Sequence, residues 1–301
     1  MTTPPPAGRF APSPTGPLHM GSLLAAVGSY LDIKSQGGRW LVRMEDVDRN
    51  RNIEGADRRI LDSLLAHGLQ WDGEVLYQTH REQAYETALQ QLFDTGRLFY
   101  CNCTRQQLRS RQTPYPGTCR EHKSADYRPA TRHDPASHAV RFEVGVEPIT
   151  FVDGILGEQR FAPADAGDFV VRRRDSLFAY QLAVVVDDAW QGITQITRGA
   201  DLLDSTPWQI ELQRALQLPT PEYTHLPLLV HGDDGSKLSK QTAAKPLRYE
   251  NASDNLLQTL RLLTVELPGE AKQWSAPEIL AAAVNRWDRS KVATTAITVT
   301  N

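Results

Sequence analysis

The chain has 301 residues, of which 40% are hydrophobic and 23% charged, and its formal net charge is −3. This composition is typical of a soluble globular protein long enough for more than one compact unit, and the charge argues neither for nor against a nucleic-acid partner. No run approaches the roughly 20 apolar residues of a membrane helix, and the proline-rich start does not resemble a secretory signal, so we expect a cytoplasmic protein with no membrane partner.

The first hundred residues alternate between predicted strands and helices. A strand over 8–12 leads through a proline-rich turn into a helix that ends at Gly37-Gly38, and a second strand follows over 39–44. Apolar residues at helical spacing then predict helices over 53–66 and 82–93, closed by Gly68 and Gly96. This order predicts a doubly wound, parallel, Rossmann-type α/β sheet.

The rhythm breaks at Tyr100 and resumes after about residue 163. The segment between them holds three cysteines, many arginines and several prolines, which is typical of an insertion. The α/β pattern continues at 168–172, 182–187 and 193–197, with a helix over 206–216 and two helices near 256–263 and 277–284. We therefore divide the chain into a first α/β half (1–99), an insertion that contains the cysteines (100–163), a second α/β half (164–240) and a short helical C-terminal segment (241–301).

The turn before the first helix carries the sequence RFAPSPTGPLHMGS at 9–22. A helix start offers unpaired N–H groups and the positive end of a dipole, both of which suit a phosphate. Gly21 lets a ligand approach the backbone, and His19 can donate a hydrogen bond to a phosphoryl oxygen. Alone, such a turn is a common structural feature.

A second polar segment, GSKLSK at 235–240, follows an apolar run. Two lysines and two serines within five residues can surround a triphosphate with ammonium and hydroxyl donors. Taken by itself, a lysine-rich loop of this kind is usually solvated surface.

Together the two segments resemble the "HIGH" and "KMSKS" motifs of class I aminoacyl-tRNA synthetases. They read His19-Met20-Gly21-Ser22 and Lys237-Leu238-Ser239-Lys240-Gln241, and only Leu238 and Gln241 depart from the second motif. RFAPSPTG at 9–16, RMEDVD at 43–48, VVVDD at 184–188 and ITRGAD at 196–201 resemble the glutamyl branch of this class. The resemblance spans residues 9–240.

The resemblance implies an enzyme that activates L-glutamate with ATP and Mg²⁺. It places His19, Gly21, Ser22, Lys237 and Lys240 at ATP, with His19 and the two lysines as catalytic groups. Fixed cations suit the two carboxylates of glutamate, and an anion suits its ammonium group. The glutamate-binding residues that it implies are Arg9, Phe10, Ala11, Pro12, Ser13, Glu45, Tyr180 and Arg198. Without the motifs, each of these residues is more often part of an ordinary surface ion pair, or in the case of Tyr180 a core aromatic residue.

The cysteines predict a metal site in a reducing compartment. Cys101 and Cys103 form a Cys-X-Cys pair, and Cys119 follows 16 residues later. Closed tetrahedral zinc needs a fourth donor. His122 is the generic choice, whereas the family resemblance implies Tyr115. We expect one structural Zn²⁺ per chain, with buried unligated cysteines as the alternative.

The length narrows the resemblance further. The 61 residues after Lys240 are too few for the helical anticodon-binding domain of a glutamyl-tRNA synthetase, and the chain resembles instead the glutamyl-queuosine tRNA(Asp) synthetase family. This implies a monomer that activates glutamate without tRNA and attaches it to queuosine in the anticodon stem-loop of aspartate tRNA. The basic residues from Arg105 to Arg141, which include Lys123, and the arginines at 172–174 are candidates for phosphate contact. The alternative for both sets is solvated surface charge.

Other functions remain open from the residues alone. A minimal glutamyl-tRNA synthetase that charges the 3′ end, or another adenylate-forming nucleotidyltransferase, would use the same ATP motifs. A non-catalytic zinc and RNA-binding module would keep the fold only, and the intact His19, Lys237 and Lys240 argue against it.

Overall fold

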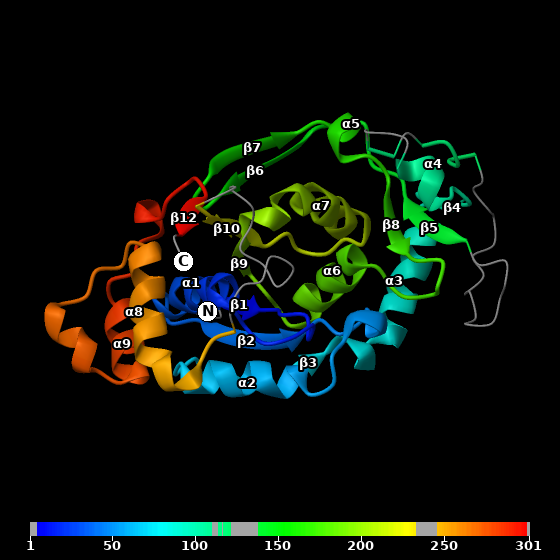
Figure 1. Ribbon diagram of the computed structural model, residues 1–301. Coiled ribbons are helices and arrows are strands. Elements are labelled where there is room, and N and C mark those ends of the chain that lie inside the picture. Colours follow the sequence, from blue (N-terminus) through cyan, green and yellow to red (C-terminus); the bar gives the residue numbers. More distant parts are fainter. Residues whose placement is uncertain (1–4, 110–113, 116, 122–137, 233–245, 300–301) are drawn as a thin grey trace.

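The computed structural model describes residues 5–109, 114–115, 117–121, 138–232 and 246–299 (Figure 1). The strands are β1 (Ala7–Phe10), β2 (Arg39–Met44), β3 (Leu76–Tyr77), β4 (Leu98–Cys101), β5 (Ala139–Phe142), β6 (Ile149–Asp153), β7 (Gly157–Phe161), β8 (Phe169–Arg172), β9 (Gln195–Gly199), β10 (Glu222–Leu226), β11 (Leu229–His231) and β12 (Ile297–Val299). The helices are α1 (Met20–Lys34), α2 (Ala56–Ala66), α3 (Glu82–Asp94), α4 (Arg105–Arg109), α5 (Pro163–Ala166), α6 (Tyr180–Trp190), α7 (Thr206–Ala215), α8 (Ala252–Leu262) and α9 (Ala276–Val284). None of these helices is long and apolar enough to span a bilayer.

A parallel sheet forms the centre of the fold, as predicted. Strands β1, β2 and β3 pair in parallel, and so do β9, β10 and β6, with β7 antiparallel at the edge. Thr194, just before β9, donates its N–H to the carbonyl of Ala7 at 2.9 Å, so β1 lies beside β9. From β1 the chain passes through α1 to β2, on one side of the β1–β9 pair. From β9 it passes through α7 to β10, on the other side. Ligands of open α/β sheets bind at such a switch point, beyond the carboxyl ends of the strands.

Two segments pair differently from the expected pattern. The parallel rhythm predicted at 168–172 is wrong, because β8 is antiparallel to β5 in a separate sheet of order β4-β5-β8. Residues 182–187 lie inside helix α6. Conversely β6, within the predicted insertion, pairs in parallel with β10 of the central sheet. Local patterns predict a strand correctly, but the partner depends on which faces the whole chain can bury.

Helix α1 packs between the sheet and the C-terminal helices α8 and α9 (Figure 1). Its apolar residues Leu23, Val27 and Leu31 are fully buried, as their helical spacing predicts. Gly28 permits a close approach to β10, since a Cβ there would lie 2.5 Å from Cδ1 of Leu226. A second core joins α3, α6 and the β4-β5-β8 sheet at the other end of the molecule (Figure 1).

The predicted helix over 53–66 begins only at Ala56. Gly55 before it adopts a left-handed conformation with φ of 68°, which ends the preceding turn and lets the helix start. The predicted bounds of α1, α3, α7 and the two C-terminal helices agree with the observed bounds to within a few residues.

Candidate active site and metal centre

His19 is the N-cap residue of α1. Its ring Nδ1 accepts the N–H of Ser22 at 3.3 Å, and Oγ of Ser22 accepts the N–H of His19 at 2.7 Å. This reciprocal capping fixes the tautomer, because a neutral ring that accepts at Nδ1 carries its proton on Nε2. His19 is therefore arranged as a hydrogen-bond donor at a helix N-terminus, where anions bind. Gly21 and Ser22 occupy the first turn of the same helix.

Arg9 near the end of β1 is held by a buried carboxylate. Its Nε and Nη2 donate to the two oxygens of Asp188 at 2.9 and 3.3 Å, and the side chains of both residues are almost fully buried. Arg43 on β2 donates its Nη1 to Oδ1 of the same Asp188 at 2.8 Å. Burial acts to raise the pKa of Asp188, but the two guanidinium groups outweigh it and lower that pKa. Asp188 thus fixes Arg9 while the Nη1 edge of Arg9 points away from this pairing.

Glu45 follows β2 directly, and its side chain is only 8% exposed. Its Oε1 lies 3.4 Å from Nη2 of Arg43, a long contact. Burial raises the pKa of Glu45 despite the opposing charges of Arg43 and Arg9. A buried carboxylate with a raised pKa gains from a further cation, so this position suits an ammonium group.

Tyr180 begins α6 and is partly buried. Burial and the charge of Glu45 raise the pKa of its hydroxyl, and Arg198 and Arg9 act in the opposite direction. These four groups come from β1, β2, α6 and β9, and they are close enough to influence one another electrostatically. The fold thereby brings together four of the residues that the sequence suggested for glutamate.

Arg198 on β9 donates hydrogen bonds to four other residues. It donates Nε to Nε2 of His225 at 3.2 Å and Nη1 to Oε1 of Gln209 at 2.7 Å. Its Nη2 donates to Oγ1 of Thr206 at 2.9 Å and to the Leu202 carbonyl at 3.3 Å. A guanidinium has five N–H donors, so these contacts with described residues leave one Nη1 hydrogen for another acceptor. Arg198 therefore cannot form the expected pair of hydrogen bonds with a substrate carboxylate. Arg9 still has donors for such a pair.

The other predicted site residues lie in three settings. Phe10 is buried and stacked on Trp40, with ring centroids 6.3 Å apart. Ala11, Pro12 and Ser13 are partly buried in the turn after β1. Lys237 and Lys240 lie outside the described residues, as does His122. Sequence reasoning did not assign roles to Asp188, Arg43, Asp153 or His225, and only the polar DD at the end of an apolar run hinted at the first of these.

The three cysteines cluster beside β4. Their Sγ atoms all lie within 4.8 Å of one another, and those of Cys103 and Cys119 are 3.7 Å apart. The hydroxyl of Tyr115 lies 3.6 Å from Sγ of Cys101 and 3.8 Å from Sγ of Cys103. Tetrahedral zinc with ordinary bond lengths would separate two sulfur ligands by about 3.8 Å, and a sulfur from an oxygen ligand by about 3.5 Å. The spacing of the cluster thus fits a tetrahedral metal ion with Tyr115 near the fourth position.

We expect about one equivalent of zinc per chain, lost in Cys101→Ser and Cys119→Ser, because thiolates supply most of the ligand field. Tyr115→Phe and His122→Ala separate the two candidates for the fourth ligand, and metal content and zinc affinity measured by mass spectrometry and competitive chelation decide between them. We expect weaker binding in Tyr115→Phe only. Weaker binding in His122→Ala with unchanged Tyr115→Phe would exclude the tyrosine.

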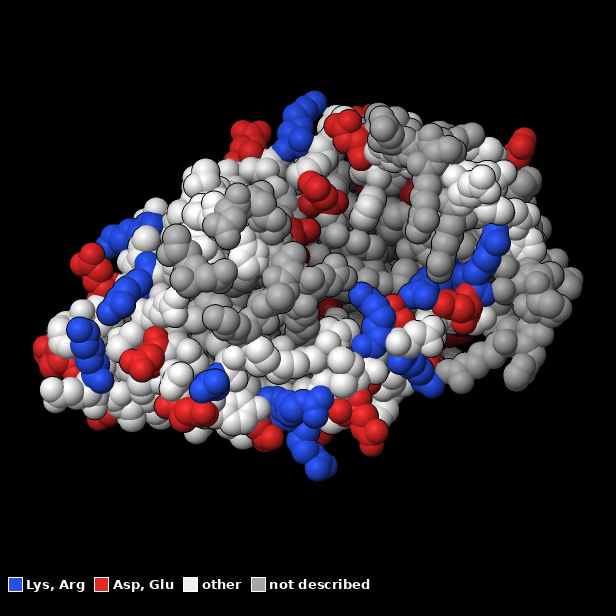
Figure 2. All heavy atoms as spheres, viewed as in Figure 1, with Lys and Arg blue, Asp and Glu red and all other residues white. Residues whose placement is uncertain are grey.

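Several arginines proposed for phosphate contact are paired with carboxylates. Figure 2 shows acidic side chains beside basic ones over much of the viewed face. The pairs are Arg120 with Asp168, Arg172 with Glu86, and Arg173 with Asp48 and Asp175, each within 2.8 Å. Arg111, Lys123, Arg128 and Arg132 lie outside the described residues. RNA would have to compete with these carboxylates for the paired arginines, and the RNA-contact surface stays a prediction.

Comparison with known proteins agrees with this arrangement. Residues 7–282 match the family described as tRNA synthetases class I (E and Q), catalytic domain. Proteins named glutamyl-Q tRNA(Asp) synthetase from Pseudomonas aeruginosa and Dechloromonas aromatica are 48% and 49% identical to the chain, covering 95% and 93% of it and 94% and 93% of their own lengths. A glutamate tRNA ligase structure from Elizabethkingia meningosepticum aligns over 98% of this chain and 67% of its own, with a TM-score of 0.80 and 22% identity, which shows the shared fold. The chain therefore belongs to the class I tRNA synthetases of the E and Q type, and within them it is a ligase of the glutamyl-Q tRNA(Asp) synthetase family.

Proposed function

We propose that this enzyme activates L-glutamate with ATP and transfers the glutamyl group to the queuosine base in the anticodon of aspartate tRNA. The proposed activation of glutamate rests on one observation, the grouping at the switch point of the sheet of Arg9, Glu45, Tyr180 and Arg198. Two cations, one carboxylate and one phenol match the charge pattern of glutamate. The names of the relatives support the proposed transfer to queuosine in aspartate tRNA.

In the proposed complex, Arg9 binds a glutamate carboxylate through its Nη1 edge, while Arg198 contributes its remaining N–H. Glu45 accepts a hydrogen bond from the substrate ammonium group. Tyr180, Phe10 at the end of β1, and the turn formed by Ala11, Pro12 and Ser13 enclose the ligand. Because Asp188 already fixes Arg9, little ordering of this side chain is required when substrate binds.

The ATP phosphates are proposed to lie at the start of α1, near His19, Gly21 and Ser22. Lys237 and Lys240, which lie outside the described residues, are proposed to bind the same phosphates. Mg²⁺ bound to these phosphates would neutralise part of their charge. The glutamate α-carboxylate oxygen attacks the α-phosphorus, the bond from that phosphorus to the bridging oxygen breaks, and pyrophosphate leaves. His19 donates from Nε2 to a phosphoryl oxygen as charge builds there, and Lys240 is the stronger candidate of the two lysines. No protein nucleophile is needed, because positioning and charge stabilisation suffice.

In the second step a hydroxyl of the modified base attacks the carbonyl carbon of glutamyl-adenylate, and AMP leaves with the bonding electrons. The three cysteines and Tyr115 would hold a structural Zn²⁺ that orders the segment around β4. This ion has no part in either step.

The proposed function predicts glutamate-dependent exchange of pyrophosphate into ATP with no tRNA present. Aspartate and glutamine are the matched control substrates, since each lacks one feature of glutamate, the chain length or the side-chain charge. Exchange supported equally by either control would contradict the glutamate assignment.

For the acceptor, radiolabelled glutamate is offered to aspartate and glutamate tRNAs with and without queuosine. Labelling is expected only on queuosine-containing aspartate tRNA, and it should survive removal of the terminal adenosine. Labelling of unmodified glutamate tRNA that requires this adenosine would identify a minimal glutamyl-tRNA synthetase instead.

A further inference from the structure

His225 on β10 is fully buried and contacts a carboxylate on one side and Arg198 on the other. Its Nδ1 lies 2.6 Å from Oδ2 of Asp153, and its Nε2 lies 3.2 Å from Nε of Arg198. The ring also stacks on Tyr223, with centroids 6.3 Å apart and planes at 6°. Three side chains from β6, β10 and β9 therefore form a continuous hydrogen-bonded row across the sheet.

The chemistry of the end members fixes the direction of every hydrogen bond in this row. An ionised carboxylate only accepts and a guanidinium only donates. Nδ1 of His225 must then carry the proton and donate to Asp153, which leaves Nε2 as the acceptor for Arg198. Because Asp153 holds the proton of the imidazole on Nδ1, the neutral ring presents Nε2 to Nε of Arg198 as an acceptor.

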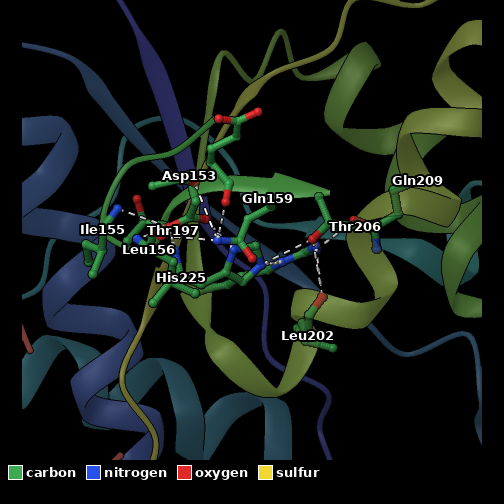
Figure 3. Close-up of polar contacts among 12 residues, drawn as sticks. Asp153, Ile155, Leu156, Gln159, Thr197, Leu202, Thr206, Gln209 and His225 are labelled. Carbon is green, nitrogen blue, oxygen red and sulfur yellow. Dashed lines mark hydrogen bonds and ion pairs between the residues drawn. The ribbon is translucent and has the colours of Figure 1, made fainter. Parts of the chain in front are cut away.

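Asp153 is itself held rigidly at the end of β6. Its Oδ1 accepts the backbone N–H groups of Ile155 at 3.0 Å, Leu156 at 2.9 Å and His225 at 3.2 Å (Figure 3). Because Oδ1 is occupied by the turn, only Oδ2 remains for the imidazole. The carboxylate cannot rotate without breaking the turn between β6 and β7.

We propose that Asp153 and His225 are positioning residues that fix the guanidinium of Arg198 and thereby set the affinity of the site for glutamate. The inference rests on the proposed function, in which Arg198 contacts the substrate carboxylate. Since only one Nη1 hydrogen of Arg198 is left by its described contacts, a small rotation of the guanidinium removes that donor from the substrate. The acceptor at Nε opposes this rotation, together with Thr206, Gln209 and the carbonyl of Leu202.

Two substitutions at His225 separate the two ends of the row. In His225→Gln the side-chain oxygen reaches the place of Nε2 and still accepts from Arg198. In His225→Asn the amide nitrogen takes the place of Nδ1 and still donates to Asp153, but Arg198 loses its acceptor. We expect the KM for glutamate to rise at least about ten-fold in His225→Asn and about three-fold or less in His225→Gln, a difference of about 1.4 kcal/mol per factor of ten. The KM for ATP should change little in either.

Asp153→Asn tests the direction of the hydrogen bonds. The amide oxygen must stay on the backbone N–H groups of the turn, so the amide NH₂ faces Nδ1 of His225. The ring must then accept at Nδ1 and carry its proton on Nε2, against the N–H of Arg198. We expect a rise in the KM for glutamate at least as large as that of His225→Asn.

His67 supplies a matched control for loss of a buried histidine. Its ring donates from Nδ1 to the Ser63 carbonyl at 2.7 Å and meets Nδ2 of Asn255 through Nε2 at 3.1 Å, and it is fully buried. His67→Asn is expected to lower thermal stability without raising the KM for glutamate. In an Arg198→Ala background, His225→Asn should have no further effect on that KM.

The positioning role of Asp153 and His225 is overturned if a folded His225→Asn enzyme keeps the wild-type KM for glutamate, or if the KM for glutamate rises as strongly in His225→Gln as in His225→Asn. It is also overturned if the effect persists in Arg198→Ala. A wild-type enzyme without glutamate-dependent exchange would overturn the proposed function and the positioning role together. A wild-type enzyme that is active, with variants whose KM for glutamate is unchanged, would overturn the positioning role alone.

Discussion

An Asp188→Asn enzyme is expected to lose glutamate-dependent exchange at low glutamate concentration by about a hundred-fold or more. Asp188 is the common partner of Arg9 and Arg43, and both arginines are buried. Removing one member of a buried ion pair typically costs about 3–5 kcal/mol, because a charge is left uncompensated. A neutral amide has only one accepting oxygen. If this oxygen takes the place of Oδ1, which accepts from Arg9 and Arg43, the amide NH₂ takes the place of Oδ2 and faces Nη2 of Arg9, another donor.

The loss is expected in the KM for glutamate as well as in stability. Without Asp188, Arg9 is drawn toward Glu45, a nearby carboxylate with which it already interacts electrostatically, and both are then withdrawn from their proposed substrate contacts. Initial rates of exchange over a range of glutamate concentrations, with denaturant unfolding in parallel, measure the two effects separately.

The neighbouring aspartate provides the control. Asp187 is equally buried, but it accepts from Gln78, Arg81 and Tyr85 rather than from Arg9 or Arg43. Asp187→Asn is therefore expected to destabilise the fold while leaving the KM for glutamate within about three-fold of wild type. Equal glutamate KM values in the two variants would show that Asp188 is structural only.

Replacing His19 by asparagine is expected to lower the rate of exchange by about 10²–10³, the usual effect of removing one donor to a developing oxyanion. Asparagine is a good N-cap and can still accept the N–H of Ser22, so α1 should start as before. It lacks a donor in the place of Nε2, and the proposed contact with the phosphoryl oxygen is lost. The KM for glutamate should change little, since this donor acts mainly in the transition state.

The comparison with His19→Ala separates capping from catalysis. Alanine removes both the cap and the donor, so His19→Ala should match His19→Asn in rate but lose about 1 kcal/mol more of the free energy of unfolding. Single-turnover rates and urea denaturation test the pair. A His19→Asn enzyme with the wild-type rate would confine His19 to starting the helix.

Much of this arrangement could be predicted from local sequence. Apolar residues at helical spacing in 20–34 and 82–94 predicted α1 and α3, since a buried helical face needs no distant information. The two ATP motifs, the Cys-X-Cys pair and the glutamyl-type segments carried the resemblance to the family that the comparisons then showed. The cysteines were also expected to cluster, and Cys101, Cys103 and Cys119 do.

Only the tertiary structure decided the partners of the buried charges. Arg9 meets Asp188 across 179 residues of sequence, and His225 meets Asp153 across 72. A buried charge must find a partner, but which one it finds depends on the order of strands in the sheet and not on nearby residues. The same holds for β8, because the α/β pattern continued over 168–172 in the sequence, but the antiparallel pairing with β5 was decided by packing. The sequence determined the elements and the chemistry available at their ends. The position of β1 beside β9 at the centre of the sheet decided which of those groups share a site.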